Sequence, residues 1–144
     1  MNQYCDKDLS NGKSIIKKEI KTKRYVVYGD PGALSSNKPA HDTVWDSVKA
    51  TRLKARIDLE NQQENLPLFS GPLILSAMLF MPTRYKRFEN KYHDARPSLE
   101  MLLRFIESIG QGIIYTGNIC KITATKIYSF NPRIEFILQE LKDE

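Results

Sequence analysis

The chain has 144 residues, of which 41% are hydrophobic and 27% are charged, and its net charge is +5. This length fits one domain with a sizeable core, and no repeat or low-complexity run points to another class of protein. The longest apolar run, 72–81, is shorter than the ~20 residues that a helix needs to cross a bilayer. The polar start of the chain predicts no secretory signal. We therefore expect a cytoplasmic protein that does not contact a membrane.

The first part of the chain divides into a polar extension and a predicted strand. Residues 1–23 are rich in lysine and weakly patterned, so we interpret them as an N-terminal extension and assign residues 24–144 to one folded domain. Tyr25–Tyr28 is a short run of β-branched and aromatic residues that Gly29 and Pro31 end. Such a run predicts a strand followed by a loop.

A long helix is predicted next. Residues 43–63 contain neither Pro nor Gly and keep an approximate helical period, which predicts an amphipathic helix that Asp42 or Thr43 caps. The stripe that we expect this helix to bury comprises Val44, Val48, Ala55 and Leu59, broadened by Trp45 and Leu53.

Three further strands follow from their patterns. Residues 72–82 are apolar on both faces of a strand, which predicts burial on both sides, against a second layer or a partner subunit. Residues 119–130 and 133–139 alternate between apolar and polar side chains, as half-buried strands do. Together with a second helix, described next, these elements predict an α+β fold: a single domain with a mixed β-sheet and two main helices.

The second helix is predicted between Ser98 and Ile109. Ser98 suits the cap, Pro97 suits the first turn, and Gly110 and Gly112 end the helix. The apolar residues Leu99, Leu102, Leu103, Ile106 and Ile109 form one stripe, and Glu100, Arg104 and Glu107 point outward.

The stretch from Tyr92 to Ser129 resembles the RusA-type Holliday junction resolvases. The likeness covers roughly Arg24 to Leu141 and depends on the order of the elements and on His93, Arg96, Pro97, Leu99, Leu102, Arg104, Gly112–Tyr115, Lys126–Ser129, Pro132 and Arg133. The resemblance implies a RusA-like fold in an intertwined homodimer. It also implies cleavage of branched DNA with Mg²⁺ or Mn²⁺, in DNA recombination and repair.

The acidic positions of that family are mostly replaced in this chain. Its two Asp at the helix start fall on Ser98 and Glu100, and its Asn falls on Met101. Its third Asp, in the following loop, has no acidic counterpart among residues 116–118, where Asn118 stands nearby. Magnesium needs several oxygen ligands, and carboxylates neutralise its charge, so Glu100 alone makes a poor cage.

The family site positions to test are therefore Ser98, Glu100, Arg104 and Asn118, with Glu100 as the candidate metal ligand. Structural interpretations stand beside these roles. Ser98 can simply cap the helix, and Glu100 and Arg104 have the i, i+4 spacing of a solvated ion pair. A further carboxylate could come from Asp94, Glu107 or Glu89.

Basic residues gather before the second helix, with the aromatic side chains of Tyr85, Phe88 and Tyr92 between them. Clustered cations with interleaved aromatic residues suit a phosphate backbone, although most charged runs are solvated surface. The candidate DNA-binding residues are Lys38, Arg84, Lys86, Arg87, Lys91, His93 and Arg96.

The cysteines and histidines point to no other chemistry. Cys5 and Cys120 lie far apart in sequence, so neither a disulfide framework nor a zinc site is predicted. Cys120 alternates with apolar residues and is predicted to be a core residue. His41 and His93 match no nucleophile motif.

Three functions fit these observations. The first choice is a RusA-like protein that binds branched or duplex DNA and whose metal-dependent nuclease activity is reduced or lost. The alternatives are an active Mg²⁺-dependent endodeoxyribonuclease that resolves Holliday junctions, and a dimeric interaction protein that does not bind DNA.

Overall fold

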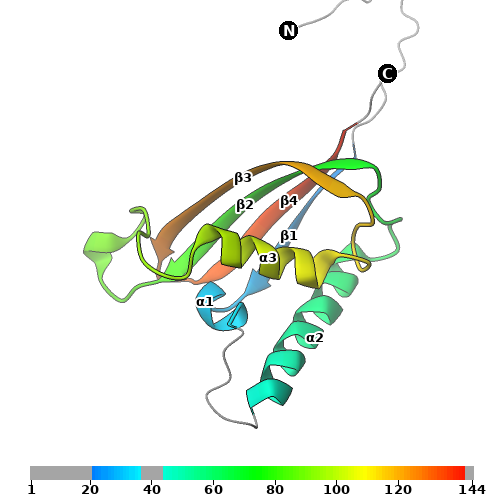
Figure 1. The fold of residues 1–144 in the computed structure, drawn as a ribbon. Helices are drawn as coiled ribbons and strands as arrows, with labels where there is room; N and C mark the ends of the chain where they lie inside the picture. The colour runs from blue at the N-terminus through cyan, green and yellow to red at the C-terminus, as the bar shows by residue number, and fades with distance from the viewer. Residues whose placement is uncertain (1–20, 37–43, 142–144) are drawn as a thin grey trace, which may run out of the picture.

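A four-stranded mixed sheet in the order β1-β4-β2-β3 forms the framework of the protein (Figure 1). The computed structural model describes residues 21–36 and 44–141, without the side chains of 44–47. The elements are β1 (Thr22–Tyr28), α1 (Pro31–Leu34), α2 (Val44–Gln63), β2 (Pro72–Pro82), the 3₁₀ turn η1 (Lys86–Phe88), α3 (Leu99–Gly110), β3 (Asn118–Ser129) and β4 (Arg133–Glu140). The predicted α+β class, mixed sheet and two main helices are confirmed.

Several predictions lie outside the described residues. They concern most of the N-terminal extension, Lys38, the cap at Asp42 or Thr43 and the packing of Trp45. At the other boundary of the extension, β1 begins at Thr22, so Thr22 and Lys23 belong to the sheet. No helix among the described residues is long and apolar enough to span a membrane.

β2 is one of the two central strands and supplies more buried residues than any other strand. It pairs in parallel with β3 and antiparallel with β4. Alternate residues of β2, from Leu73 to Met81, are buried, and they face the apolar side of α3, where Leu102, Ile106 and Ile109 are also buried. The predicted apolar stripe of α3 is therefore confirmed: Leu102, Ile106 and Ile109 are buried, and Leu99 and Leu103 are partly buried against the core.

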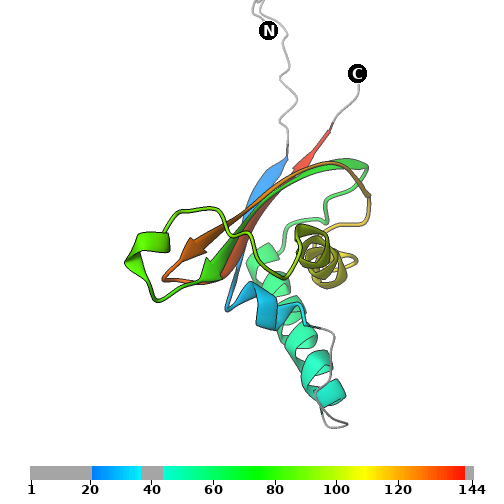
Figure 2. The ribbon, with the colours of Figure 1, turned by 60° about the vertical axis from the view of Figure 1, so that its left-hand side comes forward.

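Within one chain β2 is buried on one face only, so no second layer covers its other face, and the predicted burial there against a partner subunit stays a prediction. The residues between the buried ones, such as Ile74, Met78 and Phe80, are only partly buried. The reason is architectural, because α1, α2 and α3 all lie on one side of the sheet and leave the other side open (Figure 2). A partner subunit would be needed to complete the burial that the sequence predicted.

α2 packs on the sheet only through its second half. Ala55 and Leu59 are buried as predicted, but Leu53 is 58% exposed, which corrects its place in the buried stripe. The first half of the helix extends away from the sheet (Figures 1 and 2). Leu53 therefore finds no strand to cover.

Cys120 is exposed, so its prediction as a core residue was wrong. The register between β2 and β3 shifts at this point: Leu73 faces Ile119, whereas Ile74 faces Lys121. Cys120 is the extra residue of this bulge, and a bulge leaves one residue unpaired and interrupts alternation. Ile122, beyond the bulge, is likewise exposed because β3 is the outermost strand.

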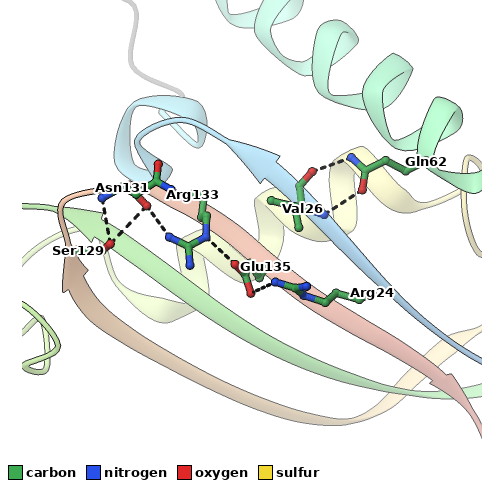
Figure 3. A network of polar contacts seen from close by, with 7 residues as sticks. All are labelled: Arg24, Val26, Gln62, Ser129, Asn131, Arg133 and Glu135. Carbon is green, nitrogen blue, oxygen red and sulfur yellow. Dashed lines mark hydrogen bonds and ion pairs between the residues drawn. The ribbon is translucent and has the colours of Figure 1, made fainter.

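The opposite edge of the sheet, β1, is closed by a side chain. The Gln62 amide of α2 accepts a hydrogen bond from the Val26 N–H (2.9 Å) and donates one to the Val26 carbonyl (2.6 Å) (Figure 3). Gln62 therefore occupies the position that a neighbouring strand would take, and it protects an edge that could otherwise pair with another chain.

A carboxylate between two arginines joins β1 and β4 on the open face of the sheet (Figure 3). Glu135 accepts hydrogen bonds from Arg24 Nη2 (2.6 Å) and Arg133 Nε (2.5 Å). Partial burial alone would raise the pKa of Glu135, but the hydrogen bonds from Arg24 and Arg133 hold it below its ordinary value. The Arg133 guanidinium also stacks on the Phe80 ring, 3.8 Å from its centroid.

Replacing Glu135 with Gln should lower the free energy of unfolding by about 1–3 kcal/mol at pH 7, because two guanidinium groups lose a charged acceptor. The pKa of Glu135 is lowered on folding, so its contribution is present above the ordinary carboxyl pKa and is lost as the pH falls through the folded pKa. The difference in the free energy of unfolding between the variant and the unchanged protein should therefore be smaller at pH 3 than at pH 7. Urea unfolding at both pH values measures it.

The exposed pair Glu100–Arg104 provides the control, since both side chains are 75% exposed. Glu100→Gln should cost no more than about 0.5 kcal/mol. Equal losses in the two variants would contradict the structural role of Glu135.

Candidate nucleic-acid interface

The residues between β2 and α3, 83–97, form a basic loop at one end of the sheet (Figure 1). The backbone of this loop is hydrogen-bonded to the outer edge of β3. Asn90 N–H donates to the Tyr128 carbonyl (2.9 Å), Tyr128 N–H donates to the Lys91 carbonyl (2.9 Å), and His93 N–H donates to the Lys126 carbonyl (3.0 Å). The basic loop therefore has a fixed position, because an edge strand supplies its partners.

Three rings of the basic loop and the Tyr128 ring of β3 form a row of contacts. Tyr85 and Phe88 meet edge to face with centroids 6.0 Å apart, and Phe88 lies 5.5 Å from Tyr128. The centroids of the His93 and Tyr128 rings are 4.8 Å apart. Such contacts add to the stability that burial gives. Tyr92 is 79% exposed and stands apart from this row.

Two arginines of the basic loop lie on these rings. The guanidinium of Arg84 is 5.7 Å from the Tyr85 centroid, and that of Arg87 is 5.1 Å from Tyr85 and 4.9 Å from Phe88. A guanidinium on an aromatic face is oriented without losing its charge, so its N–H groups remain available to an anion. The other candidate cations, Lys86, Lys91 and Arg96, are exposed.

His93 serves this surface as a ring and not as a cation. Its pKa is lowered, first by burial and then by the positive charge of Lys126. Its Nδ1 atom is buried and has no hydrogen-bond partner among the described residues. At neutral pH the imidazole is therefore neutral, and its contribution to the interface is its contact with Tyr128.

Lys126 positions the segment that leads into α3. Its Nζ donates to the carbonyls of Ala95 (2.7 Å) and Pro97 (2.6 Å). Burial lowers the pKa of Lys126, an effect that the negative charge of Asp94 partly offsets. The sequence indicated Lys126 only as part of the family likeness. Its role depends on alternation along β3, which places it on the same face as Tyr128.

The start of α3 is built as a capped helix. Ser98 Oγ accepts a hydrogen bond from the Met101 N–H (3.2 Å), and Arg104 Nη2 donates to Glu100 Oε2 (2.9 Å). The cap at Ser98 and the surface ion pair are thus as the structural interpretation predicted. Pro97 precedes this cap, so its predicted place in the first turn was wrong.

Asn118 is not brought together with Ser98 and Glu100. α3 has 12 residues and is therefore about 18 Å long at the usual rise per residue. Ser98 caps its start, whereas β3 begins with Asn118 beyond its other end, where the Asn118 N–H donates to the Gly71 carbonyl (3.2 Å). Asn118 therefore lies at the far end of the sheet from the basic loop.

The side chains around Ser98 do not suit a divalent metal. They line a hollow of about 520 Å³, in which Arg52 and Arg104 face three serine hydroxyls and one carboxylate, that of Glu100. Two guanidinium groups disfavour a metal cation beside them, and Glu100 already forms an ion pair with one of them, Arg104. Among the described residues, no three His, Cys, Asp or Glu side chains form a group that could hold a metal ion.

No protein-family model and no curated protein matches this chain.

We expect Lys126→Met to lower the free energy of unfolding by about 1–3 kcal/mol, because two carbonyl groups lose a charged donor. Amide hydrogen exchange should accelerate at Ala95, Arg96 and Ser98, in the segment that the Nζ contacts hold. Lys121→Met on the same strand is the matched control, since Lys121 is exposed. Equal effects of the two substitutions would show that Lys126 does not position this segment.

Proposed function

We propose that this protein binds the backbone of branched or duplex DNA through the basic loop. In this proposal it is a RusA-like protein whose metal-dependent nuclease activity is reduced or lost. The observation that supports DNA binding most directly is the placement of Arg84 and Arg87 on the rings of Tyr85 and Phe88. Guanidinium groups held in this way can make paired hydrogen bonds to phosphate oxygens.

The electrostatics of the molecule support the same surface. The chain has a net charge of +5, and the basic loop concentrates five cations, Arg84, Lys86, Arg87, Lys91 and Arg96. Binding to phosphate releases counterions, so the affinity should depend steeply on salt. This mode of binding requires none of the carboxylates that the resolvase site has lost.

The proposal includes a homodimer in the cytoplasm. Its support is the open face of the sheet, where Ile74, Met78 and Phe80 are only partly buried and Ile137 is exposed. A twofold arrangement would place two basic loops on one assembly, and a junction offers two pairs of arms to such an assembly. DNA recombination and repair are the processes in which branched DNA would be met.

Replacing Arg84 and Arg87 together with Gln should weaken binding to a four-way junction at least about tenfold at low salt. The slope of log affinity against log salt should become shallower by about 2, since each lost phosphate contact removes about one counterion. Fluorescence anisotropy across a salt series measures both quantities. Phe88 and Tyr85 remain in place, so circular dichroism should be unchanged.

The control is the double substitution Lys49→Gln with Lys54→Gln, which removes the same charge from exposed positions on α2. This part of α2 extends away from the basic loop (Figure 1). An equal loss in the control would indicate a general charge effect and refute the assignment to the basic loop.

Loss of the nuclease activity predicts that the protein leaves a labelled four-way junction intact in Mg²⁺ or Mn²⁺, even in molar excess. Glu100→Gln should behave as the unchanged protein does, because Glu100 pairs with Arg104 and not with a metal. Denaturing gels of the junction strands give the readout. Cleavage that Glu100→Gln abolishes would contradict this part of the proposal.

A further inference from the structure

A hollow of about 550 Å³ opens beside the basic loop. Its lining consists of Pro82, Thr83, Arg84, Tyr85, Phe88 and Tyr128. Three of these six residues are aromatic, and they come from two segments, the basic loop and β3. Tyr128 reaches the hollow because the loop backbone is hydrogen-bonded to β3 at this residue.

The walls of the hollow suit a flat, apolar ring. The Tyr85 and Phe88 planes stand at 83° to each other, so they form a corner, and the Tyr128 ring is tilted by 37° from Phe88. Tyr85 is 47% exposed and so offers part of its surface to a ligand. The volume lies within the usual range for small-ligand pockets, about 300–1,000 Å³.

A negative charge is accommodated at the rim. Arg84 lines the hollow, and Arg87 lies on the rings of Tyr85 and Phe88. A ligand with an aromatic face and an adjoining anion would satisfy both features at once. An apolar side chain of a protein would fill the corner but would leave the guanidinium groups without a partner.

A nucleotide has this combination, because its base has two aromatic faces and its phosphate lies a few bonds away. Bases inside a paired duplex cover their faces with their neighbours, so they cannot stack on protein rings. Only an unpaired base can enter, and such bases occur at branch points, bulges and single strands. Stacking of this kind tolerates any base because every base has such a face.

We propose that the hollow binds one unpaired nucleobase, stacked on Tyr85 with its edge against Phe88, and with its phosphate held by Arg84 and Arg87. This inference rests on the proposed function, because the same loop must first bring DNA to the surface. It goes further by giving the protein a means to distinguish distorted from fully paired DNA. Direct contact with the backbone alone would give no such distinction.

The test uses two duplexes of equal length that differ in one 2-aminopurine, which is either paired or extrahelical as a one-base bulge. The protein should bind the bulged duplex about tenfold more tightly, and stacking should quench the fluorescence of the extrahelical base. Tyr85→Leu should remove the quenching and bring the ratio of the two affinities to about one, while its loss of the ring under Arg84 and Arg87 weakens binding to both duplexes alike. Tyr85 is nearly half exposed, so its replacement leaves the core intact.

Tyr92→Leu is the matched control, since Tyr92 belongs to the same loop but does not line the hollow. It should retain the preference. Equal affinities of the unchanged protein for the two duplexes would overturn the inference, leave the proposed function standing and favour a protein side chain as the occupant. No binding to either duplex at low salt would refute the proposed function itself, and loss of the preference in both variants would refute the assignment to this hollow.

Discussion

The hydrogen bonds between the basic loop and the outer edge of β3 are the constraint on which the proposed interface depends. An edge strand leaves its outward N–H and C=O groups unpaired, and here the loop backbone takes up those at Tyr128 and Lys126. The Lys126 side chain then fixes the carbonyls of Ala95 and Pro97. These hydrogen bonds hold the basic loop against the sheet, next to Tyr128 and the start of α3.

The partner of each arginine determines whether its charge is available. Arg133 shares the Glu135 carboxylate with Arg24, so both of these guanidinium groups are engaged in ion pairs on the open face of the sheet. Among the described residues, Arg84 and Arg87 contact aromatic rings and no carboxylate. A ring orients a guanidinium without neutralising it. The basic loop therefore differs from the neighbouring part of the open face: ion pairs hold the open face together, whereas Arg84 and Arg87 keep their charge available to an anion.

The sequence predicted the elements well because each has a local signal. The helical period predicted α3, Ser98 predicted its cap, and Gly and Pro residues marked the ends of the strands. The errors have a common origin in the tertiary arrangement. Nothing local indicates that the second half of α2 alone packs on the sheet, which leaves Leu53 exposed, or that a bulge turns Cys120 outward. The role of Tyr128 was equally hidden, since it depends on a pairing between β3 and the basic loop.

The central claim is that DNA meets this protein at the basic loop and not on the open face of the sheet. The most direct measurement is a titration of ¹⁵N-labelled protein with a four-way junction at low salt, followed by amide chemical shifts. The account predicts that the largest shifts cluster at residues 84–96 and at Tyr128, while β1 and β4 change little. Shifts that centre on Arg24 and Ile137, or a spectrum that the junction does not alter, would contradict it.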